Sequence, residues 1–162
     1  MLLGLGYPGG VRVDEMAKSG DIRAFQFPRP LLKEDHFLFS FSGLKTAALQ
    51  QLSQLSESQR RVQCHDLCAS YQEAIVEVLV SKLKKACTQT QVNFVSITGG
   101  VSANSRLRQV AFDWAKKEHV SLAIPPLRYC TDNAAMIGLA ALQRLKLGEF
   151  SSHDLSPSPR SL

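Results

Sequence analysis

Two adjacent glycines, Gly99 and Gly100, join an apolar strand to a helix within the run S-I-T-G-G-V-S-A-N-S-R-L-R. Glycines at such a junction let a ligand approach the backbone where a Cβ atom would block it. The helix that follows offers free N–H groups and the positive end of its dipole to an anion. This pattern predicts a nucleotide or phosphate site at the two glycines. The alternative is a tight turn in which Ser102 or Asn104 only caps the helix.

The run Y-C-T-D-N, residues 129–133, follows the next predicted strand and also leads into a helix. Ligands of parallel sheets bind beyond the carboxyl ends of the strands, so this loop and the glycine loop should share one rim. Asp132 either caps the helix or, if Thr131 is the cap, is free to bind a metal ion. The four histidines form no metal-binding pair, so this chain does not supply a full metal site.

Gly10 and Asp14 form a third candidate, because a glycine-rich loop leads there into a helix with an acid in its first turn. The carboxylate would accept hydrogen bonds from ribose hydroxyls, and Gly10 would allow close approach. The alternative is a surface helix whose acid complements the helix dipole. No suitable histidine can be identified as a base for Ser40, Ser42 or Lys45, so no catalytic nucleophile is predicted.

Composition and charge are those of an ordinary soluble domain. The chain has 162 residues, of which 44% are hydrophobic and 20% are charged. A net charge of +5 permits a polyanionic partner without requiring one. No apolar run is long enough to span a bilayer and no signal peptide is recognisable, so we expect no membrane association and a cytoplasmic location. The four cysteines, including Cys64 and Cys68, are expected to be small core residues rather than a metal or redox pair.

Hydrophobic periodicity predicts an α/β domain, and the serine- and proline-rich end of the sequence predicts a disordered tail over residues 149–162. The first half should contain a short helix ended by Gly20, an aromatic strand at 37–41, a helix over 44–51 and a long helix opened by a capping box of Ser56 and Gln59. The second half should alternate strand 92–98, helix 103–118, strand 120–124 and helix 132–147. This alternation is typical of a parallel sheet with right-handed crossovers.

Four sequence blocks, taken together, resemble one known family. They are L-G-L-G-Y-P-G-G, F-S-F-S-G-L-K-T, T-G-G-V-S-A-N-S-R-L-R and Y-C-T-D-N-A-A-M-I. Their order and spacing are similar to those of the tRNA N6-adenosine threonylcarbamoyltransferases (TsaD, formerly O-sialoglycoprotein endopeptidase), over residues 1–148. The resemblance implies transfer of a threonylcarbamoyl group from threonylcarbamoyl-AMP to N6 of the adenosine just 3′ of the tRNA anticodon.

The resemblance also implies a fold, a site and partners. The fold would be part of the second lobe of the two-lobed, ribonuclease-H-like fold shared by actin, the large heat-shock chaperones and sugar kinases. Asp132 would bind one divalent metal ion, iron or zinc, and Asn104 would contact the nucleotide. Gly10 and Asp14 would belong to the substrate pocket, with Asp14 near the ribose and the glycine pair at 99–100 as its floor. Expected partners are tRNA, a paralogous protein and the small ATPase of the modification complex.

The sequence departs from the family pattern at its beginning. The family carries two histidine metal ligands and a glycine-rich loop upstream, and neither has a counterpart here. The chain is therefore expected to be the C-terminal part of such an enzyme, to lack the N-terminal lobe and to be inactive alone. Two other functions are considered. One is an ATPase or kinase of the same superfamily, which would not explain residues 129–136, and the other is a non-catalytic scaffold or RNA-binding module.

Overall fold

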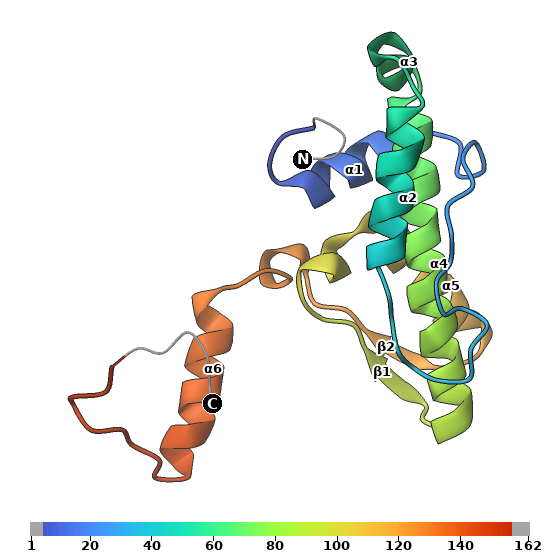
Figure 1. Cartoon of the computed structure of the whole chain (residues 1–162). Helices are drawn as coiled ribbons and strands as arrows, with labels where there is room; N and C mark the ends of the chain where they lie inside the picture. Colours follow the sequence, from blue (N-terminus) through green and yellow to red (C-terminus); the bar gives the residue numbers. More distant parts are fainter. Residues whose placement is uncertain (1–4, 157–162) are drawn as a thin grey trace.

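The computed structural model describes residues 5–156, and the long helix α4 (Cys64–Thr90) forms its axis (Figure 1). Its length follows from a continuous apolar stripe at three- and four-residue spacing, with no glycine or proline between its ends. Three helices precede it: α1 (Gly9–Ala17), α2 (Ser42–Ser53) and α3 (Glu57–Val62). Strand β1 (Phe94–Ser96), helix α5 (Ser105–Lys117), strand β2 (Ser121–Ala123) and helix α6 (Ala134–Lys146) follow it.

Strands β1 and β2 form a parallel pair, as the alternation of strands and helices predicts. Phe94 lies opposite Ser121 and Ser96 lies opposite Ala123. Each strand has three residues and is shorter than the predicted stretch around it. Because the strands run in the same direction, the loops that follow them start from the same end of the sheet, on the common rim that the sequence predicts.

Both strands are entered through a residue in the left-handed conformation. Helix α4 ends at Thr90 and the cap residue after it, Gln91, has φ 55°; the turn after α5 places His119 at φ 56°. A left-handed residue at the end of a helix turns the chain away from the helix axis. The same backbone conformation therefore leads from each helix into the strand that follows it.

Apolar clusters along α4 join it to its neighbours. One joins α2 to α4, a second joins α1 to α4, and a third joins the end of α4 to the sheet and α5. A fourth packs Leu107 of α5 against Val76 and Val80 of α4. This last cluster seats the beginning of α5, and with it the glycine loop, on the middle of α4.

All four cysteines are free and buried, which confirms the prediction that they are core residues. Cys68 is 0% exposed. Burial, together with the neighbouring Cys64, raises the pKa of the Cys68 thiol to about 12. A thiol with so high a pKa stays protonated, and therefore unreactive, at neutral pH.

Gly20 has a role in packing that the sequence did not reveal. It follows α1, where the sequence predicted only a helix stop, and its N–H donates to the carbonyl oxygen of Ala17. A Cβ atom at Gly20 would lie 2.1 Å from the carbonyl oxygen of His65, in the backbone of α4. Any side chain at this position would therefore push α1 and α4 apart.

The aromatic strand predicted at residues 37–41 is wrong. The segment forms neither helix nor strand, and within residues 5–156 β1 pairs only with β2. The rings of Phe39 and Phe41 do stack at 6.0 Å, so the alternation predicted which side chains share a side. Lys82 of α4, itself buried, holds the preceding turn by donating to the carbonyl oxygens of Glu34 and His36. The alternating sequence thus predicted which rings lie together, but a strand also requires a neighbouring strand to pair with, and the pattern does not supply one.

The capping box of Ser56 and Gln59 is present, but it opens α3 and not the longest helix. The Ser56 hydroxyl accepts from the Gln59 N–H at 3.3 Å, and the Gln59 side chain accepts from the Ser56 N–H at 2.8 Å. Gln63, at φ −94° and ψ 9°, separates α3 from α4. Helix α3 buries none of its residues, so no packing face extends α4 across this break.

Helix α6 lies apart from the other helices and buries none of its residues (Figure 1). Large apolar side chains nevertheless cover it, with exposed fractions between 45% and 64% for Met136, Ile137, Leu139, Leu142 and Leu145. A helix that is apolar on all sides is normally covered by other protein. The described part of the chain leaves α6 without such a cover.

Residues 149–156, which follow α6, form no helix or strand and expose their side chains. The rest of the predicted disordered tail, residues 157–162, lies outside the described residues. Among the helices of residues 5–156, none is long and apolar enough to cross a membrane.

Candidate nucleotide site

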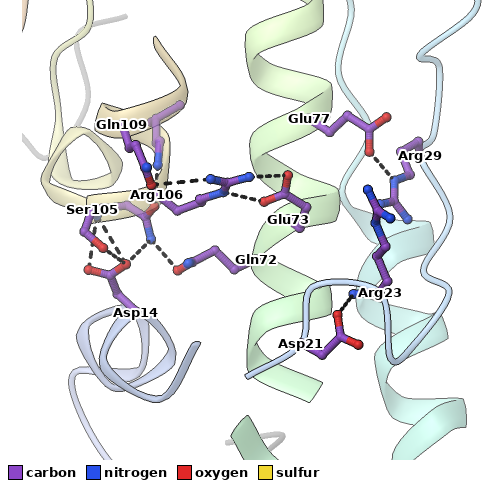
Figure 2. Close-up of polar contacts among 12 residues, drawn as sticks. Asp14, Asp21, Arg23, Arg29, Gln72, Glu73, Glu77, Ser105, Arg106 and Gln109 are labelled. Atoms are coloured by element: carbon purple, nitrogen blue, oxygen red, sulfur yellow. Dashed lines mark hydrogen bonds and ion pairs between the residues drawn. The ribbon is translucent and has the colours of Figure 1, made fainter. Parts of the chain in front are cut away.

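The predicted site residues meet at the N-terminus of α5. Asn104 caps this helix, with its side-chain oxygen accepting from the N–H of Leu107 at 2.9 Å. The carboxylate of Asp14, from α1, accepts from the N–H of Ser105 at 3.1 Å and from its hydroxyl at 2.8 Å (Figure 2). The Asn104 amide also donates to Asp14 at 3.1 Å, across 90 positions of sequence. The structure therefore brings Asp14 and Asn104 together, while their part in binding a ligand stays a prediction.

Gln72, on α4, is a member of this cluster that the sequence analysis missed. Its side-chain oxygen accepts from the amide of Asn104 at 2.7 Å, and the residue is 8% exposed. Buried polar side chains are almost always hydrogen-bonded, so each one points to a partner. The signal for Gln72 is its place in the buried stripe of α4, midway between Cys68 and Val76.

An ion pair fixes the first turn of α5 to α4. The guanidinium of Arg106 donates to both carboxylate oxygens of Glu73, at 2.7 and 2.9 Å (Figure 2). These hydrogen bonds raise the pKa of Arg106 above its usual range. A two-point contact of this kind sets direction as well as distance. The beginning of α5 is thus held by α4 and by α1 together.

The charge of Asp14 lies where the dipole of α5 favours an anion. Because α1 begins at Gly9, Asp14 is in the second turn of that helix and not in its first turn as predicted. Its carboxylate therefore complements the dipole of α5 rather than that of its own helix. This corrects the interpretation of Asp14 as an acid that stabilises the start of a surface helix.

The backbone at Gly99 and Gly100 forms a tight, exposed turn beside this cluster. Gly99 has φ 87°, in the left-handed region that favours glycine. Its carbonyl oxygen accepts from the N–H and the hydroxyl of Ser102, at 3.0 and 2.6 Å. A Cβ atom built on either glycine would meet no non-neighbouring atom within 4 Å. The conformation explains a glycine at position 99, whereas nothing within the described chain requires one at position 100.

Gly10 has the same open surroundings in the first turn of α1. It is exposed, and a Cβ atom there would also meet nothing within 4 Å. The fold alone therefore does not explain why glycine stands at positions 10 and 100. Both positions leave room for a ligand to approach the backbone, which is the property that the sequence analysis assigned to them.

Asp132 lies exposed in the loop before α6 and does not cap that helix. The cap is Asn133, whose side-chain oxygen accepts from the N–H of Met136 at 3.0 Å. The predicted choice between Asp132 and Thr131 as the cap is therefore wrong, since the next residue takes this role. No group of three or more His, Cys, Asp or Glu side chains within residues 5–156 is placed to hold a metal ion. The side chains of residues 5–156 therefore do not form a complete metal site by themselves.

Comparison with known proteins gives the same family as the four sequence blocks. The family model described as TsaD: tRNA N6-adenosine threonylcarbamoyltransferase matches residues 1–139, a range that includes every predicted site residue. A curated protein of that name from Bdellovibrio bacteriovorus is 55% identical over 161 residues. Others from Anaeromyxobacter dehalogenans and Thermosipho africanus are 48% and 44% identical.

These alignments include 98–99% of this chain but 47% of each relative. The chain thus spans about half the length of the curated relatives it matches. The family match extends over most of the sequence, from the glycine-rich beginning to the first residues of α6. The chain therefore belongs to the tRNA N6-adenosine threonylcarbamoyltransferase family.

Proposed function

We propose that this chain carries the nucleotide-binding part of an enzyme that transfers a threonylcarbamoyl group from threonylcarbamoyl-AMP to N6 of the adenosine 3′ of the tRNA anticodon. Membership of the family supports the reaction class. The observation that carries the proposal is the meeting of Asp14 and Asn104 at the N-terminus of α5, beside two glycines with open space in front of them.

In this proposal, the nucleotide half of the donor lies against the glycine turn. Gly10 and Gly100 let it approach the backbone. Asn104 contacts the nucleotide, and Asp14 accepts hydrogen bonds from the ribose hydroxyls. The two side chains are hydrogen-bonded to each other in the free chain, and Asp14 is also hydrogen-bonded to Ser105, so binding exchanges part of this network for contacts with the ligand.

The reaction depends on positioning more than on a nucleophilic side chain. N6 of the adenosine attacks the carbamoyl carbon, the bond from that carbon to the phosphate oxygen breaks, and AMP leaves as the amine gives up a proton. An exocyclic amine is a weak nucleophile. The rate must therefore come from holding both substrates together and from stabilising charge on the carbonyl and the phosphate. This chemistry requires no covalent enzyme intermediate.

The proposal extends to the metal and the partners that the family resemblance implies. Asp132 supplies one carboxylate ligand to a divalent ion, iron or zinc, whose remaining ligands come from outside this chain. The enzyme works on tRNA in the cytoplasm, with a paralogous protein and a small ATPase.

Helix α6 is the surface that we assign to the rest of the enzyme. Its apolar side chains are exposed on all sides, and the chain spans 47% of the length of its relatives. The half of the family sequence that is not spanned here, forming the N-terminal lobe of a two-lobed enzyme, would cover this helix. Its arrival would also bring the missing metal ligands to the rim that carries Asp132.

Substitution of Gly100 by alanine tests the nucleotide site. The added methyl group meets no atom of the free chain, so the melting temperature should stay unchanged. It would stand where the nucleotide approaches the backbone, so AMP binding in an NMR titration should weaken by about tenfold or more. Gly138→Ala on α6, which is equally open, is the matched control and should bind AMP like the parent. Unchanged AMP binding by Gly100→Ala, or no AMP binding by the parent, would contradict the proposal.

A further inference from the structure

A single arginine on α5, Arg108, connects the two loops of the candidate site. Its Nε donates to the carbonyl oxygen of Ser102 at 2.7 Å, in the loop that follows β1. Its Nη2 donates to the carbonyl oxygen of Pro125 at 2.6 Å and lies 3.1 Å from the Sγ of Cys130, both in the loop that follows β2. One guanidinium group therefore spans both loops.

The loop after β2 closes around this guanidinium. The short turn Leu127–Tyr129 brings Cys130 back to the start of the loop, where its thiol lies 3.6 Å from the carbonyl oxygens of Pro125 and Pro126. Cys130 is 3% exposed. The loop thus directs acceptor groups at the cation of Arg108, and hydrogen bonds to a charged donor are stronger than those to a neutral one.

In residues 5–156, backbone hydrogen bonds do not join the loop after β1 to the loop after β2. The last hydrogen bond between the strands joins the N–H of Ile97 to the carbonyl oxygen of Ala123 at 3.0 Å. Beyond it, each loop makes its backbone hydrogen bonds internally, such as Tyr129 to Pro126 at 2.8 Å. Within the described residues, Arg108 is thus the side chain that ties one loop to the other.

We propose that Arg108 is a positioning residue that fixes the glycine loop, residues 99–104, relative to the loop that carries Asp132. The inference rests on the proposed function, in which the first loop binds the nucleotide and the second supplies a metal ligand. Arg108 touches neither ligand and acts through Ser102 and Pro125. The planar fork of arginine holds two acceptors in a fixed relation, which the single ammonium of lysine does not. A change in the glycine loop on nucleotide binding is therefore transmitted to the second loop.

Hydrogen exchange, measured by mass spectrometry on the full chain without any ligand, tests whether Arg108 connects the two loops. In Arg108→Gln, the amides of Tyr129 and Cys130 should exchange about tenfold faster or more, because their loop has lost its charged donor. The amides in the middle of α4 should keep the parent rate. Lys117→Gln is the matched control, since it removes an exposed positive charge from the other end of α5, away from both loops. Parent-like exchange of residues 125–131 in a folded Arg108→Gln variant would overturn the inference.

Adding AMP distinguishes positioning from general stabilisation. In the parent and in Lys117→Gln, AMP should slow exchange in both loops, whereas in Arg108→Gln it should slow exchange in residues 99–104 alone. Protection of both loops in Arg108→Gln would overturn the inference. If AMP protects neither loop in the parent, the proposed function fails, and the ligand-free comparison still decides the role of Arg108. If Arg108→Gln does not fold, Arg108→Lys replaces it. Lysine can hold only one of the two loops, so exchange should become faster in the other loop. Parent-like exchange in both loops would overturn the inference.

Discussion

Asn104 is a helix cap, one of the two roles that its sequence allowed, and its contact with a ligand stays a prediction. Its oxygen caps α5, and its amide donates to Asp14 and Gln72. Local spacing offered Asn104 as one of two possible caps, and the family resemblance implied that Asp14 belongs to the same pocket. The sequence could not predict Gln72, because that contact depends on how α4 rotates against α5, and periodicity places residues on a face without naming the partner across it.

Removal of the Asp14 carboxylate should destabilise the fold. Asp14→Ala removes the Asp14 acceptor of the Ser105 N–H and hydroxyl, and it leaves the Asn104 amide with Gln72 as its remaining acceptor. We expect the free energy of unfolding in a urea titration to fall by about 1–3 kcal/mol. Glu15→Ala, on the next residue, is the control. Its exposed ion pair with Arg12 spans 3.7 Å and should be worth less than about 1 kcal/mol. Equal losses in the two variants would show that Asp14 does not hold α5.

The buried thiol of Cys68 should make stability fall in alkaline solution. Its pKa is about 12 in the folded chain, against 9.0 for an exposed thiol. Between these values the unfolded chain loses the proton and the folded chain keeps it, so the free energy of unfolding decreases as pH rises. This group contributes a slope of up to about 1.4 kcal/mol per pH unit. Chemical denaturation between pH 8 and pH 11 should show a shallower decline for Cys68→Ala than for the parent. Identical slopes would rule out this contribution of Cys68.

At the scale of elements, helices were easier to predict than strands. A helix satisfies its own backbone, so a stripe such as that of α4 is sufficient evidence for it. A strand needs a neighbour, and the aromatic alternation at residues 37–41 has none within the described chain. The break at Gln63 was missed for a related reason. It follows from α3 having no surface to bury, which only the packed structure reveals.

The contact between α1 and α4 should depend on Gly20. In Gly20→Ala the new methyl group would overlap the backbone of His65, so α1 must move away from α4. Thermal unfolding should show a loss of about 1–3 kcal/mol. Gly43→Ala tests the same chemical change in α2, where the nearest atom, Cγ of Pro30, is 3.9 Å away. That variant should be neutral or slightly stabilised. A neutral Gly20→Ala variant would mean that the two helices are not held at this distance.

At the scale of the whole molecule, the order of the sequence motifs predicted the family, and the comparisons confirm it. The two-lobed architecture stays a prediction, because the described residues include one small parallel sheet and its helices. Helix α6 marks the limit of sequence reasoning at this scale. The sequence predicted a helix over residues 132–147, and the exposure of its apolar side chains emerges only when the neighbouring elements are placed.

The isolated chain should form no threonylcarbamoyladenosine from tRNA and threonylcarbamoyl-AMP. It holds one proposed metal ligand and one side of the proposed nucleotide site, and α6 buries no residue within the described part of the chain. Mass spectrometry of the digested tRNA nucleosides measures the product. The full-length relative from Bdellovibrio bacteriovorus serves as the positive control, since it is 55% identical to this chain. Product formed by the purified chain alone would show that the described half is sufficient.

The left-handed residues that lead into the two strands have a consequence for protein engineering. Gln91 and His119 hold a backbone conformation that costs a residue with a Cβ atom about 1 kcal/mol, and glycine adopts it without that cost. Glycine also raises the entropy of the unfolded chain, so part of the stability gained by relieving this conformation is lost again. Both positions lie at the ends of the helices that lead into β1 and β2, whereas the candidate nucleotide site lies beyond the opposite ends of these strands. Replacing either residue by glycine is therefore a way to stabilise the chain for laboratory study without changing a residue of the candidate nucleotide site.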